Sequence, residues 1–425
     1  MKIHKKELFF VKLYDRMVGI VGKKQKKENT ALYHKNDFIL LKEEEPQTEV
    51  KETQPARSGK SRNKSTEVKH PGLWKKILLC VGTFLGLLIV TVIAVCHVLL
   101  NGPSPTMRDA LVLSAKQASA TKWLPGLFLD DALVAQIELD SKTVTYDVVS
   151  IDDIAPKPDA EGKDEWADAI DGIKFVRIDK PAFKAYLLMV KDPSRLFVGT
   201  SSDFKSGATG GKIIFDIAEK YQAVAAINGG EFPDTGGVGN GAVPIGITFA
   251  GGELVYNGHT NRTFMGFTSD NRLIVSEGMT AARGKELGIR DGVCFQTGNC
   301  LITNDGQNVT LHYADGNVGR AQRTAIGQRA DGTVLLLVTD GRTASSVGAT
   351  HNELIEIMLE YGAIAAGKLD GGSSAMMYYR DYYDLYDYDM STLDEYQRKG
   401  LVNNYKAFTK PRNLPTYFIV GASKQ

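Results

Sequence analysis

The sequence predicts an α+β protein in which a mixed, strand-rich sheet domain with few helices is preceded by a single transmembrane helix. One run of 24 residues, Ile77–Leu100, contains no Asp, Glu, Lys or Arg. From about Gly172 onward, short segments rich in branched residues alternate with Gly, Asn-Gly and Asp-Gly turns, the pattern of strands joined by tight turns. Only two stretches in that region have the periodicity of a helix.

The apolar run is long enough to cross a bilayer. As a helix it extends about 36 Å, against a hydrocarbon core of ~30 Å. Trp74, Lys75 and Lys76 precede it, and residues 1–76 hold 19 Lys and Arg against 10 Asp and Glu. Because basic flanks stay in the cytoplasm, we expect a single-pass protein of the cell membrane with a cytoplasmic N-terminus. A cleaved signal peptide would instead have a shorter apolar region, ~7–15 residues, close to the start of the chain.

Four parts are therefore expected along the chain. Residues 1–76 form a basic, partly disordered cytoplasmic tail, 77–100 the membrane helix, 101–171 an extracytoplasmic stalk and 172–425 the sheet domain. Beyond the apolar run the chain holds 32 basic and 40 acidic side chains. This acidic balance is the opposite of a nucleic-acid-binding surface, so we expect no nucleic acid among its partners.

The elements of the sheet domain follow from local sequence. The clearer helix starts at the capping box Thr350 to Glu353 and stops at Gly362, while the other covers Lys212–Tyr221. Strands are expected over 173–178, 185–190, 195–198, 223–228, 245–249, 263–268, 272–276, 323–328, 333–339, 363–370 and 416–420. Two Gly-Gly turns each follow a helix ending in Tyr and then a buried strand. This similarity predicts that both turns lie at the same edge of the sheet.

Polar residues gather in four Gly-flanked clusters that follow or lie within these strands. Glycine pairs permit a close approach of the backbone and can present N–H groups to an anion, arginine offers a fork that fits a phosphate diester, and carboxylates can act at a sugar carbon. Each cluster alone is also typical of an ordinary hairpin turn. The clusters are Asn228-Gly229-Gly230-Glu231, Arg323-Thr324, Asp340 with Arg342, and Asp370-Gly371-Gly372-Ser373-Ser374.

The order of these clusters, followed by Pro411-Arg-Asn-Leu-Pro, resembles the phosphodiester glycosidase family over roughly residues 172–422. The resemblance implies hydrolysis of a sugar-1-phosphodiester between the anomeric carbon and its bridging oxygen. Ser373 stands where relatives often have a third glycine. Animal members carry their anchor near the C-terminus, so their substrate is not transferred to this chain. The N-terminal anchor suggests a bacterial surface protein that acts on phosphodiester-linked wall polymers or exopolysaccharide.

The resemblance places all four clusters at the site. We assign Asp370 and Glu231 as the acid/base or nucleophile pair, with Asp340 as a third catalytic candidate. Arg323 and Arg342 form the expected phosphate fork, and the turn after Asp370 forms an anion nest. The remaining substrate-binding candidates are Asn228, Gly229, Gly230, Thr324, Gly371, Gly372, Ser373 and Ser374.

Cysteine and histidine suggest little further chemistry. The Cys294 and Cys300 spacing permits a small disulfide loop in an oxidising compartment. His351, in the first turn of a helix, is expected to face solvent, and a site made of three histidines is not expected. We therefore expect no cofactor, although the acids leave a divalent cation open.

Two other functions fit the same residues. One is a non-catalytic module that binds phosphodiester-linked wall polymers, and the other is a metal-dependent phosphodiesterase that breaks the P–O bond. Besides the lipid bilayer and a sugar-1-phosphodiester or phosphodiester-linked polysaccharide, the sequence points to no protein partner.

Overall fold

The structure, a computed structural model, describes residues 72–116, 121–140, 144–154, 164–234, 239–314, 319–343, 345–403 and 410–423. The chain divides into two units, Met1–Gly72 and Leu73–Gln425, and every element below belongs to the second. The predicted cytoplasmic tail lies outside the described residues up to position 71.

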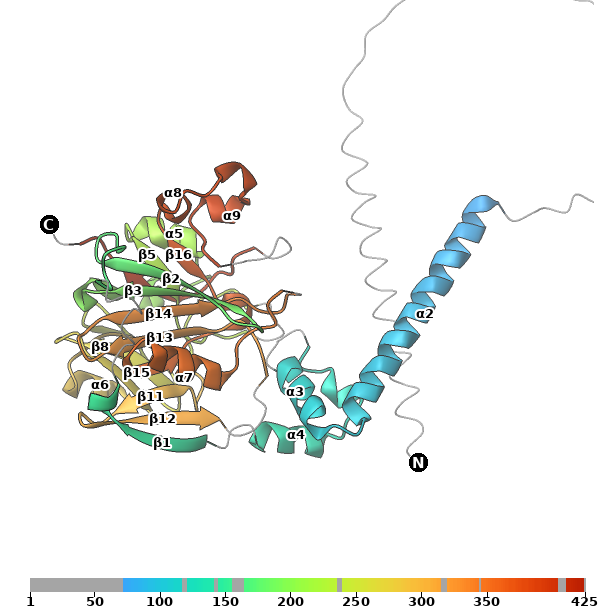
Figure 1. The fold of residues 1–425 in the computed structure, drawn as a ribbon, viewed down its shortest axis with the longest axis horizontal. Helices are drawn as coiled ribbons and strands as arrows, with labels where there is room; N and C mark the ends of the chain where they lie inside the picture. Colours follow the sequence, from blue (N-terminus) through green and yellow to red (C-terminus); the bar gives the residue numbers. More distant parts are fainter. Residues whose placement is uncertain are drawn as a thin grey trace, which may run out of the picture. The chain divides into compact units, whose positions relative to one another are not determined.

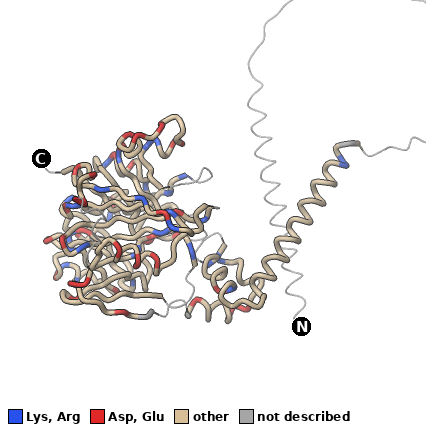
Figure 2. The backbone as a smooth tube through the Cα atoms, viewed as in Figure 1, with Lys and Arg blue, Asp and Glu red and all other residues tan. Residues whose placement is uncertain are grey.

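The predicted apolar helix is present as α2 (Leu73–Asn101). Within it, Trp74–Asn101 is long and apolar enough to cross a membrane. Figure 2 shows charge only at its first turn, and its large apolar side chains are exposed along most of its length. Helices α3 (Pro105–Lys116) and α4 (Asp131–Asp140) share a small apolar core with the end of α2.

The rest of the described chain is built from three sheets (Figure 1). The eight-stranded sheet has the order β1 (Val144–Ser150), β12 (Asn308–Ala314), β11 (Cys300–Asn304), β15 (Ala363–Lys368), β13 (Thr324–Arg329), β14 (Val334–Thr339), β3 (Lys184–Val190) and β2 (Ile173–Asp179). The five-stranded sheet has the order β7 (Glu253–Tyr256), β6 (Thr248–Ala250), β10 (Ile289–Phe295), β8 (Thr263–Thr268) and β9 (Leu273–Glu277). The four-stranded sheet has the order β16 (Met377–Tyr379), β5 (Ala225–Asn228), β17 (Thr416–Val420) and β4 (Leu196–Thr200).

The two faces of the eight-stranded sheet bury different cores, because side chains alternate along a strand. On β3, Tyr186 and Leu188 point into the core shared with the other two sheets, while Leu187 and Met189 point to the opposite face. Helix α7 (His351–Glu360) covers that opposite face (Figure 1). Each fully buried Leu contributes roughly 1.5–3 kcal/mol to this packing.

The remaining helices are short. Helix α5 (Ile214–Lys220) packs on the four-stranded sheet, and α6 (Ala281–Glu286) lies beside β10. Helices α8 (Tyr382–Leu385) and α9 (Glu395–Arg398) follow β16.

The predicted α+β class is confirmed, and each predicted strand overlaps an observed one. The pairs between named strands are antiparallel, which refines the expected mixed sheet. The predicted helix from the Thr350 capping box is confirmed, with both reciprocal hydrogen bonds formed. Strand β1 extends the sheet into the segment expected to be a stalk, because it pairs over its whole length with β12.

Candidate active site

The two Gly-Gly turns meet where the eight-stranded and four-stranded sheets adjoin. Asn228, the last residue of β5, donates a hydrogen bond from Nδ2 to the carbonyl of Asp370 (2.7 Å). The amide of Asp370 donates to the carbonyl of Gly229 (3.3 Å). The turns are therefore adjacent as predicted, but they belong to two sheets and not to one edge of a single sheet.

Asn228 ties together the segments of the site. It is fully buried, and its Oδ1 accepts hydrogen bonds from Thr324 Oγ1 (2.7 Å) and from the amide of Met376 (3.1 Å). Through these three bonds, Asn228 and Thr324 hold the loops of the site in register.

Close backbone contacts explain the first glycine pair. A Cβ at Gly229 would lie 2.5 Å from Thr416 Oγ1, and one at Gly230 would lie 2.3 Å from the carbonyl oxygen of Cys294. Their amides donate to the carbonyl and to the hydroxyl of Thr416. The predicted use of these N–H groups for an anion is therefore not seen, since Thr416 already accepts from both.

The expected anion nest has the same character. The amide of Gly371 donates to the Asp370 carboxylate (2.9 Å), that of Gly372 to the carbonyl of Gln322 (2.9 Å), and that of Ser374 to the carbonyl of Gly371 (3.1 Å). These three N–H groups are occupied within the protein and are not available to an anion.

Asp370 has an acid strength unlike that of an exposed carboxyl group. Burial raises its pKa to about 7, against partial lowering by the Ser374 hydroxyl, the Gly371 amide and the nearby Arg412. The neighbouring charge of Glu231 raises it further. Asp370 and Glu231 therefore lie within electrostatic range of each other and form a carboxyl pair.

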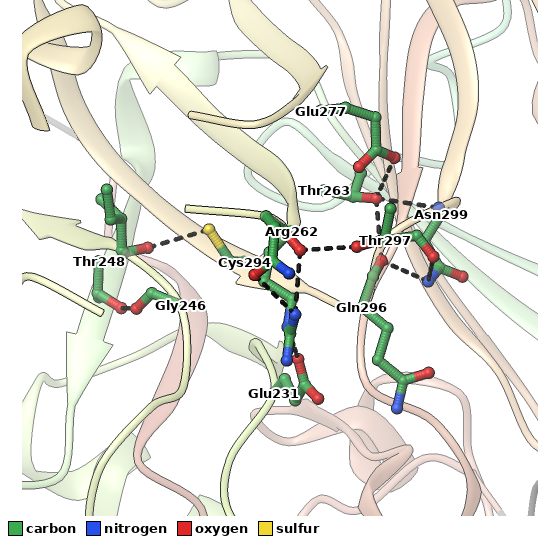
Figure 3. Close-up of polar contacts among 12 residues, drawn as sticks. Glu231, Gly246, Thr248, Arg262, Thr263, Glu277, Cys294, Gln296, Thr297 and Asn299 are labelled. Carbon is green, nitrogen blue, oxygen red and sulfur yellow. Dashed lines mark hydrogen bonds and ion pairs between the residues drawn. The ribbon is translucent and has the colours of Figure 1, made fainter. Parts of the chain in front are cut away.

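Glu231 is held by an arginine that the sequence did not single out. Arg262 Nε donates to Glu231 Oε2 (2.7 Å), and the two side chains are only 21 % and 14 % exposed. Figure 3 shows the Glu231 carboxylate at the tip of the Arg262 side chain. Arg262 Nη1 in turn donates to the carbonyl of Asn261 (3.0 Å), which also accepts from the Thr297 hydroxyl. The Glu231 carboxylate thus has an arginine partner, whereas the raised pKa of Asp370 lets it hold a proton near neutral pH.

A second arginine, Arg412, joins the Gly372 loop to the loop after Glu231. Its guanidinium binds both carboxylate oxygens of Asp234 at 2.8 Å, donates to Ser373 Oγ (3.3 Å) and lies over the Phe232 ring at 4.9 Å. The hydroxyl of Ser373 thus has a partner in Arg412. Sequence reasoning quoted Arg412 as part of a motif and gave it no role.

Two arginines, Arg323 and Arg342, lie near the Gly371–Gly372 turn that follows Asp370. Arg323 is 8 % exposed and donates to the carbonyls of Ala349 and Gly319, and burial together with Arg342 lowers its pKa to about 10, so it stays charged at neutral pH. Arg342 adopts a positive φ of 56°, which is uncommon for a residue with a side chain. A Cβ at Gly372 would lie 3.5 Å from Arg342 Nη1, so this guanidinium lies against the Gly372 turn.

Lys368, at the end of β15, is a third basic side chain that the sequence did not single out. Burial lowers its pKa well below the ordinary value, and Arg323 lowers it further, so its neutral form is favoured. Within the described part of the chain, no carboxylate stabilises the charge of Arg342. Arg323 and Arg342 are therefore electrostatically suited to an anion.

Asp340 faces the interior. It is 2 % exposed and accepts a hydrogen bond from Tyr186 Oη (2.8 Å), and its charge helps to raise the pKa of that tyrosine. The following residues still approach the site, because a Cβ at Gly341 would lie 2.7 Å from the amide of Gln322. Asp340 therefore anchors the loop that carries Arg342, through its buried hydrogen bond with Tyr186.

Histidines and cysteines lie outside this arrangement. His351 was expected to face solvent, and this is wrong: it is 4 % exposed, because its Nε2 donates to the carbonyl of His312 (2.9 Å). Burial lowers its pKa to about 3. In the described ranges, no group of three or more His, Cys, Asp or Glu residues is arranged to hold a metal ion.

The disulfide that the sequence permitted is not formed. Both thiols are free and buried. Cys294 Sγ donates to the carbonyl of Ile247 (3.3 Å), whereas Cys300 Sγ faces Glu277 Oε1 (3.6 Å). The two side chains point to different neighbours, and burial raises both thiol pKa values, that of Cys294 to about 12.

Comparison with known proteins identifies the domain. Residues 221–421 match the model of the family described as phosphodiester glycosidase. This match covers slightly less than half of the chain, and it agrees with the resemblance to the phosphodiester glycosidase family noted in the sequence.

Individual relatives are distant. The SPbeta prophage-derived uncharacterized protein YomE of Bacillus subtilis (strain 168) is 29 % identical over 181 residues, which cover 41 % of this chain and 27 % of that protein. This chain therefore spans about a quarter of the length of that relative. Among solved structures, the auto-inhibited catalytic domain of zebrafish N-acetylglucosamine-1-phosphodiester alpha-N-acetylglucosaminidase has a TM-score of 0.45 at 16 % identity, over 66 % of this chain and 89 % of that one. A protein of Burkholderia pseudomallei K96243 has a TM-score of 0.37 at 15 % identity, over 56 % and 74 % of the two chains.

Proposed function

We propose that this chain hydrolyses the glycosidic C–O bond of a sugar-1-phosphodiester and releases free sugar and a phosphomonoester. One observation carries the proposal: Asp370, whose pKa is raised to about 7, is within electrostatic range of Glu231, which is ion-paired with Arg262. Two carboxyl groups in such different surroundings are suited to separate acid and base roles.

The reaction follows from that division. In its protonated form Asp370 donates its proton to the bridging phosphate oxygen as the bond between that oxygen and the anomeric carbon breaks. Glu231 accepts a proton from the water that forms the new bond to the anomeric carbon. Arg262 occupies Oε2 of Glu231, and in the described part of the chain Oε1 has no hydrogen-bond partner and is available to that water.

The phosphate is bound by Arg323 and Arg342. A phosphodiester carries one negative charge, and breaking the C–O bond moves further charge onto the bridging oxygen until Asp370 protonates it. Arg342 has no carboxylate partner among the described residues, so its attraction strengthens as this charge develops. The buried Arg323 lies within electrostatic range of Arg342 and adds to the positive potential at the phosphate site.

The anchor sets the location. Lys75 and Lys76 lie in the first turn of α2, and the basic residues 1–71 precede it in the sequence. By the distribution of positive charge, the tail is cytoplasmic and the glycosidase domain extracytoplasmic. The substrate is then a polymer with phosphodiester links at the cell surface, of the wall or exopolysaccharide type. Because β1 pairs with β12, we assign the domain to residues 144–425 in place of 172–425.

The test is a product assay on the full-length chain in detergent micelles. We expect release of reducing sugar from UDP-N-acetylglucosamine or from a synthetic sugar-1-phosphate methyl diester. Asp370→Asn and Glu231→Gln abolish it, whereas Glu253→Gln, on a side chain that is 76 % exposed, does not.

Each rival function has its own signature in this assay. A chelator-sensitive reaction that yields sugar-1-phosphate would identify a metal-dependent phosphodiesterase. Binding without any turnover would identify a polymer-binding module. Either result contradicts the proposal.

A further inference from the structure

Exposed apolar side chains lie on the helices that follow α2. Helices α3 and α4, joined through the short helix η1 (Pro125–Leu127), bury one side of each helix in a shared core and leave apolar residues on the other. On α3, Met107 and Leu111 stand one helical turn apart, on the face opposite the buried Val112 and Leu113. The exposed apolar residues, called the juxtamembrane patch below, are Met107, Leu111, Trp123, Leu127 and Leu139.

The chain holds this patch close to the end of α2. Leu100, in the last turn of α2, is buried in the same core as residues of α3 and α4. Only residues 102–104 separate Asn101 from Pro105, so the first turn of α3 begins at most ~14 Å from the end of α2, at ~3.3–3.6 Å per residue. The headgroup region extends about 5–7 Å beyond the hydrocarbon core on each side. A helix that leaves the bilayer at Asn101 therefore keeps the patch within reach of the lipid.

The composition of the patch fits a lipid surface. Trp123 is 58 % exposed, and tryptophan is enriched at the boundary between membrane and water because its ring is amphipathic. Exposed apolar patches on soluble domains mark sites of interaction with membranes or proteins, and here the patch continues from the exposed apolar surface of α2. Continuity with a candidate membrane span favours lipid as the occupant.

Charge attraction contributes little to such binding. Residues 101–140 hold three basic and five acidic side chains. Two of the basic ones are paired, Arg108 with Asp109 (2.8 Å) and Lys116 with Glu138 (3.1 Å). Anionic headgroups would therefore not be attracted, and the binding is by insertion of apolar side chains.

Helix α3 also contacts the candidate active site. A Cβ at Gly319 would lie 2.5 Å from the amide nitrogen of Ser114 in α3, so the two backbones touch. The carbonyl of Gly319 accepts a hydrogen bond from Arg323 Nη2 (2.7 Å). The loop that leads to Arg323 is thus packed on the helix that follows the anchor.

We propose that the juxtamembrane patch inserts into the leaflet on the domain's side of the bilayer, and that α3 thereby holds the Arg323 loop at the membrane surface. The segment expected to be a stalk then seats the domain on the membrane. A site held there favours sugar-1-phosphodiesters that are carried by lipids of the same leaflet. This preference rests on the proposed function, whereas the lipid contact of the patch does not.

The chain contains a direct reporter of the lipid contact, because Trp74, Trp123 and Trp166 are its three tryptophans. Trp123 is left alone by Trp74→Phe with Trp166→Phe, in the full-length chain reconstituted into phosphatidylcholine vesicles. We expect brominated phosphatidylcholine to quench its fluorescence, with no dependence on salt. The matched control keeps Trp166, which packs in the sheet domain, and brominated lipid should not quench it.

A charge in the patch should abolish this contact. Leu127→Asp should remove the lipid quenching of Trp123, whereas Val148→Asp, on an exposed position of β1, should not. Quenching of Trp123 by aqueous iodide, without quenching by brominated lipid, overturns the membrane contact. Protection from both quenchers would indicate cover by protein, such as a second copy of the chain, and also overturns it.

The same vesicles test the position of the active site. We compare kcat/KM for a hexadecyl sugar-1-phosphate diester in the bilayer with that for the methyl diester in solution. Leu127→Asp should lower the ratio of the two severalfold, and an unchanged ratio overturns the placement of the Arg323 loop at the membrane surface. If neither diester is cleaved, the proposed function fails, and the quenching of Trp123 still decides the lipid contact.

Discussion

Arg262 Nε donates a hydrogen bond of 2.7 Å to Glu231 Oε2, and both side chains are largely withdrawn from solvent. This hydrogen bond fixes the orientation of a carboxylate that lies within electrostatic range of Asp370. The acid/base division proposed for the site depends on it.

Replacement of Arg262 by Gln should lower kcat/KM by about 10- to 100-fold, because positioning partners of catalytic groups typically have effects of one or two orders of magnitude. The loss should appear in kcat more than in KM, because Arg262 contacts Glu231 and acts on the substrate only through it. Arg283→Gln, which breaks an exposed pair with Glu286, is the matched control and should change neither constant. An unchanged kcat would contradict a positioning role for Arg262.

Hydrolysis should decline as pH rises through about 7. Asp370 acts in its protonated form, and its pKa is raised to about 7. Above that value kcat/KM should fall about tenfold per pH unit. Steady-state kinetics from pH 5 to 9 measure this, and an activity that instead rises steadily to pH 9 contradicts an acid role for Asp370.

The same group should make the fold less stable at high pH. A carboxyl whose folded pKa exceeds its unfolded value of 3.8 contributes most stability below that value and loses it as pH rises to about 7. Asp370→Asn should therefore be inactive and yet more stable than the wild type at pH 8, by on the order of 1–2 kcal/mol. Thermal unfolding at pH 8 checks the sign, and a destabilised variant would show that the carboxylate is well solvated or paired.

Arg342 should act on phosphate and not on folding. We choose Arg342→Asn because Asn tolerates the positive φ of this position. Loss of one charged phosphate contact should lower kcat/KM by about 10- to 100-fold. Arg272→Asn, on a side chain that is 72 % exposed, is the control. If both variants behave alike, Arg342 takes no part in binding.

His351 should make the protein sensitive to acid. Its pKa falls to about 3 on folding from an ordinary 6.5, so its contribution to stability is complete above pH 6.5 and is lost as pH falls toward 3. The slope approaches about 1.4 kcal/mol per pH unit at most. His351→Gln keeps a donor for the carbonyl of His312 and should flatten this slope in denaturation measured between pH 7 and 4. An unchanged slope would indicate that His351 is charged when folded.

Much of the fold was predictable from local sequence, and the misses have physical causes. The capping box at Thr350 and the buried strands near the Gly-Gly turns depend on neighbouring residues alone. Strand β10 was missed because it contains Asp291-Gly292, a typical turn pair. In the structure, a Cβ at Gly292 would lie 2.3 Å from the Phe264 ring, and the Asp291 carboxylate accepts from the amides of Val198 and Gly251. Tertiary contacts thus use both residues inside a strand.

The sequence predicted the loops that form the site, but it did not predict the basic side chains Arg262 and Lys368 that contact or neighbour them. Asp370, Glu231 and the arginines stand in Gly-flanked motifs, so the sequence draws attention to them. Arg262 and Lys368 stand before or within ordinary strands, and only the folded structure brings Arg262 to Glu231 and Lys368 near Arg323. The sequence also could not show that the amides of Gly229, Gly230 and Gly372 are hydrogen-bonded within the protein. Their acceptors, Thr416 and Gln322, are far from them in the sequence.

The most direct test of the central claim is hydrolysis of a sugar-1-phosphate methyl diester by the full-length chain in water enriched in oxygen-18. Attack at the anomeric carbon places the label in the free sugar, and mass spectrometry should find it there and lose the signal in Asp370→Asn. Label found in the phosphate instead would mean that the P–O bond breaks, and the Asp370 and Glu231 pair would not be a glycosidase site.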